Sequence, residues 1–121
     1  MIVGLRTAIY PVADLDIAKD WYPRVLGVAP YFDEPFYVGF SVGGFELGLI
    51  PDGTPGTTGV QVYWGVPDAQ AEVARLETLG AQIFDPVKDV GGGIKVGAVL
   101  DPFGNLFSVI ENPSFDLKAV R

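Results

Sequence analysis

The sequence predicts an α+β fold made of two tandem β-α-β-β-β modules, and three observations support this prediction. The chain repeats itself, since Val12 and Val66 are 54 residues apart and so are Asp14 and Asp68. Its 16 Gly and 10 Pro favour short elements joined by turns over a bundle of long helices. Hydrophobic residues make up 49% of the 121 residues, which fits a single domain, 1–121, with one core.

Each module contains one predicted helix with an acidic N-cap and a glycine stop. In the first module, Asp14 precedes a helix that ends at Gly27. In the second module, the helix follows Asp68 and ends at Gly80, so cap and stop repeat together. The apolar positions that face the core are predicted as Ile17, Trp21 and Val25 in the first helix and Val73, Leu76 and Leu79 in the second.

The strands are predicted from β-branched and aromatic runs bounded by turn residues. Module one covers about residues 1–52 and module two about 58–113, and 114–121 form a C-terminal tail. The runs are 1–10, 31–42 and 45–50 in module one, with room for one more short strand, and 60–66, 81–84, 94–100 and 106–111 in module two. Two curved mixed sheets, each with its helix on the convex face, would leave a concave pocket where we expect the function.

Composition excludes several classes of function. The chain has no Cys and no His, which removes thiol nucleophiles, iron–sulfur clusters, imidazole bases and His-based metal sites. It carries 8 Lys+Arg against 15 Asp+Glu, a net charge of −7, so nucleic acid is a poor partner. No apolar stretch is long enough for a membrane span, so we expect no membrane partner and a cytoplasmic location. Any chemistry must use carboxylates, hydroxyls, amides, Lys or Arg.

Three sequence blocks occur in the order found in a known superfamily. The blocks are Pro11-Val-Ala-Asp-Leu15 with Trp21-Tyr22 and Val25-Leu-Gly27; Val66-Pro-Asp68 with Leu79-Gly-Ala81; and Asp101-Pro-Phe-Gly-Asn105 ahead of Phe107-Ser-Val-Ile-Glu-Asn112. Together they resemble the vicinal oxygen chelate superfamily, which contains glyoxalase I, the extradiol dioxygenases and the fosfomycin and bleomycin resistance proteins. The resemblance covers residues 3–113 and implies the glyoxalase/bleomycin resistance fold.

By that resemblance, the superfamily's four metal-ligand positions fall on Thr7, Glu46, Gln61 and Ser108. Only Glu46 is a strong donor, beside one neutral amide and two weak hydroxyls. A transition-metal site needs three or more good protein donors. We therefore expect no metal ligand and no cofactor, although the resemblance leaves room for a weakly held divalent metal.

Strand alternation extends the predicted pocket beyond these four positions, because residues i and i+2 share a face. The candidate ligand-binding residues are Thr7, Ile9, Gln61, Tyr63, Val96, Ala98 and Ser108, with Val96 and Ala98 added by the resemblance; Glu46 is the candidate catalytic residue. Gly48 and Leu106 are also predicted to face inward, whereas Phe45, Leu47, Val62, Trp64 and Val109 are predicted to pack beneath the helices. The pocket would be mostly apolar.

Three functions remain open from the sequence. The favoured one is a small-molecule binding protein of the glyoxalase/bleomycin-resistance type, without a metal, whose ligand is a small apolar, aromatic or cationic organic molecule. The alternative is a glyoxalase-I-like lyase or isomerase that uses Glu46 as a base, its pKa raised by an apolar wall, or as a weak metal ligand. The third is a structural or regulatory dimer with no working pocket. A homodimer is expected because superfamily members commonly pair.

Each candidate residue also has a purely structural interpretation. Glu46 can be a strand carboxylate paired with Arg6 or another cation, because buried carboxylates need partners. Gln61 and Tyr63 can form a hydrogen-bonded core pair. Thr7 and Ser108 can be ordinary strand residues.

Overall fold

The computed structural model describes residues 1, 5–59, 61–116 and 118, and these contain two helices and eight strands. The elements are β1 Thr7–Pro11, α1 Leu15–Leu26, β2 Phe32–Glu34, β3 Tyr37–Val42, β4 Phe45–Ile50, β5 Tyr63–Gly65, α2 Ala69–Thr78, β6 Gln82–Gly91, β7 Ile94–Leu100 and β8 Leu106–Glu111. The parts of the expected strands at residues 2–4 and at Val60 lie outside the described residues.

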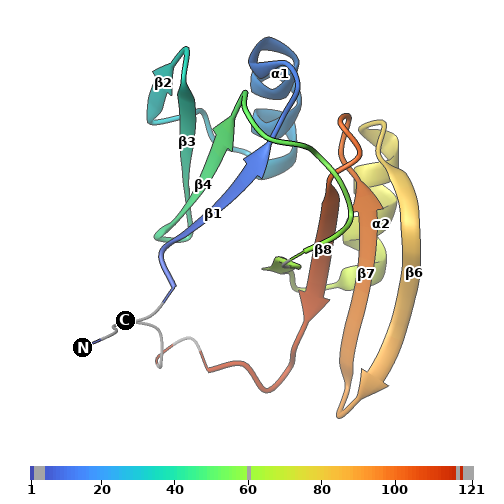
Figure 1. Cartoon of the computed structure of the whole chain (residues 1–121). Helices are drawn as coiled ribbons and strands as arrows, with labels where there is room; N and C mark the ends of the chain where they lie inside the picture. Colours follow the sequence, from blue (N-terminus) through green and yellow to red (C-terminus); the bar gives the residue numbers. More distant parts are fainter. Residues whose placement is uncertain (2–4, 60, 117, 119–121) are drawn as a thin grey trace.

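The strands form two four-stranded sheets with the same topology (Figure 1). The strand order is β1-β4-β3-β2 in the first sheet and β5-β8-β7-β6 in the second. β1 pairs parallel with β4, and β5 pairs parallel with β8; the remaining pairs in both sheets are antiparallel. Two repeated β-α-β-β-β units with mixed sheets confirm the predicted α+β fold.

Both helices begin at the predicted caps. The Asp14 carboxylate accepts hydrogen bonds from the first free N–H groups of α1, and Asp68 does the same for α2. Gly27 ends α1 with φ 75°, a left-handed conformation that glycine adopts without strain. Ile17 was wrongly predicted to face the core: it is half exposed, because the buried stripe of α1 runs along Ala18, Trp21, Tyr22 and Val25 instead. Neither helix in this part of the chain is long and apolar enough to cross a bilayer, and a cytoplasmic location stays a prediction.

Several strands differ in length from the sequence prediction. The run 31–42 is split into β2 and β3 by a turn at Pro35-Phe36, which supplies the additional short strand. The strand expected at 81–84 continues to Gly91 as β6, and three register shifts interrupt its pairing with β7. The strand expected at 60–66 shortens to β5.

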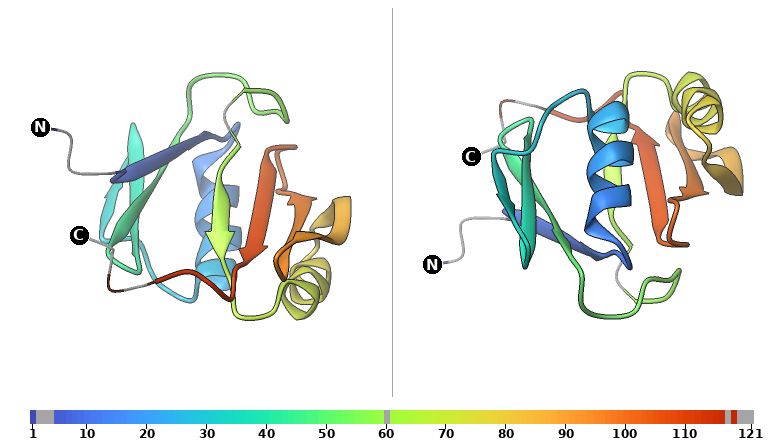
Figure 2. Two further views of the ribbon diagram at one scale, coloured as in Figure 1. Left: turned by 90° about the horizontal axis from the view of Figure 1, so that it is seen from below. Right: turned by 90° about the horizontal axis from the view of Figure 1, so that it is seen from above.

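One aromatic core joins the two sheets, with α1 between them (Figure 2). The rings of Trp21 and Tyr22 in α1 lie 6.1 and 6.4 Å from that of Phe107 in β8. On the other side, Trp64 stacks on Phe107 at 5.6 Å, and its indole N–H donates to the Tyr10 hydroxyl at 3.2 Å. The helix-covered faces therefore share one core. The helix-free face of each sheet, here called its open face, is turned outward.

A buried polar network at the β7–β8 turn connects the modules. Asp101 is only 5% exposed, and its Oδ2 accepts hydrogen bonds from the Tyr22 hydroxyl (2.7 Å) and the Asn105 amide (3.0 Å). Its Oδ1 accepts two backbone N–H groups of its own turn. Asn105 also donates to the Pro11 carbonyl at 2.6 Å and accepts from the Gly56 N–H. The turn thus holds α1, β1 and the linker between modules in place.

Candidate functional site

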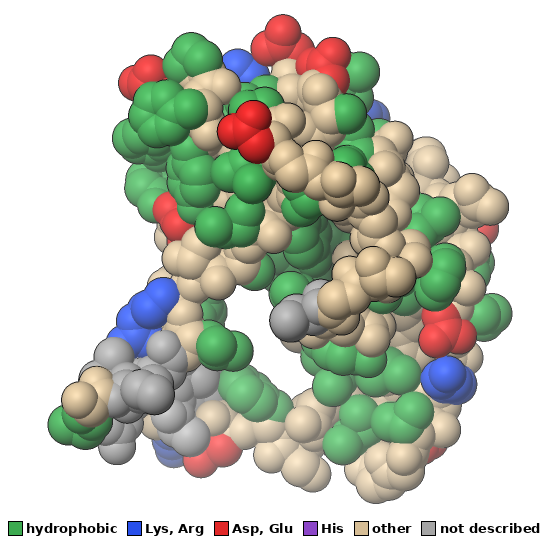
Figure 3. All heavy atoms as spheres, viewed as in Figure 1, with side chains coloured by type: hydrophobic (Ala, Val, Ile, Leu, Met, Phe, Trp, Pro, Cys, Tyr) green, Lys and Arg blue, Asp and Glu red, His purple; other side chains and the backbone are tan. Residues whose placement is uncertain are grey.

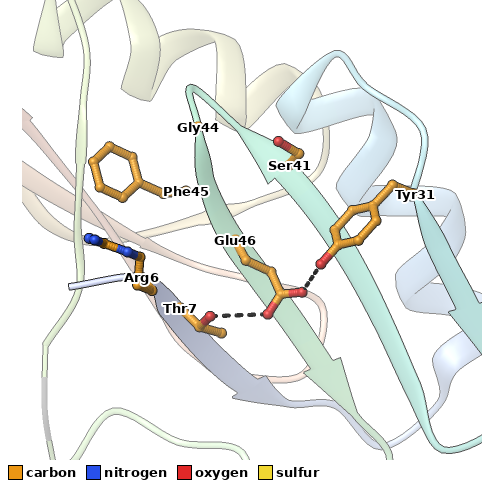
Figure 4. A pocket seen from close by; sticks show the side chains of 7 residues that line it. All are labelled: Arg6, Thr7, Tyr31, Ser41, Gly44, Phe45 and Glu46. Atoms are coloured by element: carbon orange, nitrogen blue, oxygen red, sulfur yellow. Dashed lines mark hydrogen bonds between the residues drawn. The ribbon is translucent and has the colours of Figure 1, made fainter. Parts of the chain in front are cut away.

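Three hydroxyl groups hold the Glu46 carboxylate on the open face of the first sheet, and Figure 4 shows those of Thr7 and Tyr31. Thr7 is its register partner in β1, and the Thr7 hydroxyl donates to Oε1 at 3.1 Å. The Tyr37 hydroxyl, at the start of β3, donates to the same oxygen at 2.7 Å. The Tyr31 hydroxyl donates to Oε2, and the Tyr31 backbone N–H is bonded to the Gly39 carbonyl at 2.9 Å. Three separate segments thus converge on one carboxylate.

Two glycines make room for the tyrosine rings beside Glu46. Gly39 and Gly48 are cross-strand partners in β3 and β4. A Cβ on Gly48 would collide with the Tyr37 phenol, lying 2.5 Å from its Cζ, and a Cβ on Gly39 would lie 3.3 Å from the Tyr31 ring. The bare backbone of this pair therefore lets both rings lie across the sheet, where their hydroxyls meet Glu46.

The hydrogen bonds fix the charge state of the site. Those from Tyr31 and Tyr37 are the main causes that lower the pKa of Glu46 below its ordinary value. Burial and the bond to Glu46 raise the pKa of Tyr37 to about 12, and the bond to Glu46 also raises the pKa of Tyr31. At neutral pH the site is therefore an ionised carboxylate with neutral phenol donors. The expectation that an apolar wall raises the Glu46 pKa was wrong, because hydroxyl donors surround this carboxylate.

The alternative interpretation, in which Glu46 pairs with Arg6 or another cation, has no matching ion pair among the described residues. The Arg6 guanidinium donates instead to the Leu5 carbonyl at 3.1 Å, and Figure 4 shows it turned away from Glu46. No ion pair therefore neutralises the Glu46 carboxylate within this part of the chain.

A hollow of about 440 Å³ opens beside Glu46. It is lined by Arg6, Thr7, Tyr31, Ser41, Gly44, Phe45 and Glu46. Tyr31 is 62% exposed, and hydrophobic side chains gather over the nearby β2 and β3 (Figure 3). Phe45 was wrongly predicted to pack beneath a helix: it is 39% exposed, because α1 covers the opposite end of β4 (Figure 1). Every residue of the hollow belongs to the first module.

A separate polar pair joins Gln61, just before β5, to Ser108 in β8 of the second sheet. The Gln61 amide donates to the Ser108 hydroxyl at 2.9 Å, and Ser108 is fully buried. Tyr63, the register partner of Ser108, does not bond Gln61 and is 44% exposed. The predicted site residues outside the hollow are Ile9, Gln61, Tyr63, Val96, Ala98 and Ser108. One chain thus brings Thr7 and Glu46 together, and Gln61 and Ser108 together, as two distinct pairs.

The backbone register shows how the two modules correspond. The bond from the Val12 N–H to the Ile50 carbonyl (2.8 Å) recurs as the bond from the Val66 N–H to the Ile110 carbonyl (2.9 Å). Ile50 in β4 therefore corresponds to Ile110 in β8. Two residues before each of them, Gly48 corresponds to Ser108. The module-one counterpart of Ser108 is therefore Gly48, whose side-chain space is filled by the Tyr37 phenol, and not Glu46.

These residues do not fit a metal of the kind that the superfamily uses. Thr7 and Glu46 bond each other, and the Gln61 amide nitrogen is turned to Ser108. Both carboxylate oxygens already accept hydroxyl donors. Within the described ranges, no three His, Cys, Asp or Glu side chains lie close enough together to hold an ion. The donor set is too weak and too divided for a transition-metal centre.

The chain belongs to the Glyoxalase/Bleomycin resistance protein/Dioxygenase superfamily, whose family model matches residues 4–109. This match confirms the resemblance drawn from the three sequence blocks. A search of curated proteins found no match.

Solved structures of the same fold include enzymes and a resistance protein. A glyoxalase-related enzyme from Fulvimarina pelagi has a TM-score of 0.79 and 20% identity, covering 98% of this chain and 95% of its own. A fosfomycin resistance protein from Listeria monocytogenes has a TM-score of 0.78 and 16% identity, covering 94% of this chain and 97% of its own. A lactoylglutathione lyase from Agrobacterium tumefaciens has a TM-score of 0.75 and 19% identity, covering 93% of this chain and 97% of its own. At these identities the likeness shows the fold alone.

Tyr31 and Tyr37 define the chemistry of the site but were not predicted from the sequence as site residues. The alternation rule contained a signal for Tyr37, because β3 places it on the same face as Gly39. Tyr31 lies just before β2, and its backbone bond to Gly39 and its hydroxyl bond to Glu46 hold its ring over the sheet. Those contacts could not be read from the sequence.

Proposed function

We propose that this protein binds a small organic molecule, apolar or aromatic or cationic, on the open face of its first sheet and without a metal. The observation that carries the proposal is the Glu46 carboxylate, fixed by three hydroxyls beside a hollow of about 440 Å³. The lining combines the aromatic rings of Tyr31 and Phe45 with polar side chains, and a few fixed polar groups beside apolar surface are what orient a small molecule in a binding site.

The alternative, a lyase or isomerase with Glu46 as general base, has less support. A base works best when its pKa lies near the working pH, and here hydrogen bonds lower the pKa of Glu46. A carboxylate that already accepts three donors is also less free to take up a proton. Binding through the fixed negative charge agrees better with this geometry.

A homodimer is the second part of the proposal. Ile9 and Tyr63 are 52% and 44% exposed on the open faces of the two sheets, and α1 lies between these sheets within one chain (Figure 2). If the second sheet of a partner copy covered the first sheet, it would shield these apolar side chains and deepen the hollow beside Glu46. Light scattering at micromolar concentration tests this: a dimer mass is expected, and a monomer mass would contradict it.

A thermal-shift panel tests the binding function. Neutral aromatic, aromatic cationic and aliphatic cationic compounds are added at millimolar concentration to the native chain and to Glu46→Gln. A ligand at ten times its Kd stabilises the fold by about 1.4 kcal/mol and raises Tm by roughly 3–6 °C for a chain of this size. Glu77→Gln, an exposed change on α2, is the matched control for the lost charge. If no compound shifts Tm in any of these proteins, the proposal is wrong.

A further inference from the structure

The geometry points to an aromatic ammonium ion as the ligand: one of its N–H groups donates to Oε2 of Glu46, and its ring lies against the exposed side of the Tyr31 ring. This inference rests on the proposed function and narrows it to one ligand class. Three observations carry it: the acceptor capacity of Glu46, the charge balance of the hollow and the placement of Tyr31.

The hydrogen-bond count of Glu46 leaves room for one more donor. An ionised carboxylate has about four lone-pair positions, two on each oxygen. Oε1 accepts from both Thr7 and Tyr37, so its two positions are filled. Among the residues that the structure describes, Oε2 accepts only from Tyr31. The remaining position on Oε2 suits one N–H of a ligand, because the three resident hydroxyls keep the carboxylate from rotating.

The charge of the site favours a cation over a neutral donor. The hydroxyl donors of Thr7, Tyr31 and Tyr37 are neutral, so they stabilise the carboxylate without cancelling its charge. Arg6 lines the hollow but is bonded to the Leu5 carbonyl and is turned away from Glu46 (Figure 4). Since the chain has a net charge of −7, the wider field also attracts cations.

The placement of Tyr31 favours an aromatic cation. One side of its ring lies over Gly39, where a Cβ would be 3.3 Å from the ring, while the side chain as a whole is 62% exposed. The Tyr31 hydroxyl is bonded to Oε2, so an ammonium group on that oxygen lies beside the same ring. An aryl group one or two carbons from the nitrogen would then contact the exposed Tyr31 ring.

The inference predicts a ranking of three probes of similar size. Benzylammonium carries the charge and the ring, benzyl alcohol only the ring, and cyclohexylmethylammonium only the charge. The full chain is titrated with each probe by NMR, following the amide signals of Gly39 and Gly48. We expect benzylammonium to bind about tenfold more tightly than benzyl alcohol and several-fold more tightly than cyclohexylmethylammonium.

Variants separate this inference from the proposed function. Glu46→Gln should remove the preference for benzylammonium over benzyl alcohol, whereas Glu77→Gln should keep it. Equal binding of charged and neutral probes to the native chain, or an unchanged preference in Glu46→Gln, would overturn the ammonium inference and leave the binding function standing. Absence of binding by all three probes, together with an unresponsive wider panel, would overturn both.

A second measurement does not depend on the fold of a variant. In the native chain the preference for benzylammonium should shrink several-fold between low salt and about 0.5 M salt, because salt screens a partly exposed charge pair. Benzyl alcohol binding should change little over the same range. A preference that is independent of salt would contradict an ion pair with Glu46.

Discussion

The Tyr37 hydroxyl lies 2.7 Å from Oε1 of Glu46, and it reaches this oxygen by crossing the bare backbone of Gly48. The register makes Gly48 the counterpart of Ser108 in the second module. At the same place in the repeat, the second module therefore has a buried hydroxyl that accepts from Gln61, whereas the first has a glycine covered by a phenol. The two modules share a fold but have different chemistry on their open faces.

Gly48→Ala is expected to expel the Tyr37 phenol from its place. The new Cβ would lie 2.5 Å from Cζ of Tyr37, so either the ring or the strand must move, at a cost of about 1–3 kcal/mol in the free energy of unfolding. Urea denaturation measures this loss. Gly65→Ala, in open space on β5, should cost much less. If Gly48→Ala remains as costly in a Tyr37→Ala background, the collision is not its cause.

The phenol donors are expected to control the titration of Glu46. Because their hydrogen bonds lower its pKa in the folded state, they stabilise the fold above the ordinary carboxyl pKa of 4.5, and this stabilisation is lost as the pH falls through the lowered value. Tyr31→Phe and Tyr37→Phe should each raise the Glu46 pKa, measured by carbon-13 NMR of the carboxyl group. The stability difference from the native chain should be present near neutral pH and fade as the pH falls below the ordinary carboxyl pKa of 4.5 and through the lowered value. Tyr63→Phe, which does not touch Glu46, should leave the pKa unchanged.

The repeat of caps and strand ends made most of the fold predictable. Asp14, Gly27 and Asp68 are local signals whose roles depend on a few neighbouring residues, and all three have the predicted roles. The split between β2 and β3 was harder to predict, because the turn at Pro35-Phe36 contains no glycine and lies inside a run of strand-forming residues.

The sequence predicted the positions of Thr7 and Glu46 on the sheet but not the hydroxyl donors that set the charge of the site. Thr7 and Glu46 are register partners, and strand alternation places both on the open face. The direction of the Glu46 pKa shift, however, depends on Tyr31 and Tyr37, whose hydroxyls arrive through tertiary contacts over a glycine pair. The arrangement of the two sheets also could not be predicted from the sequence, because it depends on how Trp21 and Trp64 pack around Phe107.

Asp101→Ala is expected to loosen the contact between the modules. It removes the acceptor of the buried Tyr22 hydroxyl and of two N–H groups in the β7–β8 turn, so the loss should be about 3–5 kcal/mol. Urea denaturation measures it, with the exposed Asp52→Ala as the control. In a Tyr22→Phe background the cost of Asp101→Ala should fall, because the hydroxyl left without a partner is gone. An equal cost in both backgrounds would mean that the Tyr22 bond contributes nothing.

Phe107→Ala is expected to be among the most destabilising single changes in the core. Phe107 is 3% exposed and its ring contacts those of Tyr10, Trp21, Tyr22 and Trp64, so truncation leaves a cavity bounded by elements of both modules. The free energy of unfolding should fall by about 3–5 kcal/mol. Phe84→Ala, which removes a half-exposed ring on β6, should cost far less. Because both sheets depend on the same ring, fluorescence of Trp21 and Trp64 and circular dichroism of the strands should report a single unfolding transition. Two separated transitions in the native chain would show that the modules unfold independently and that the shared core is weaker than its packing indicates.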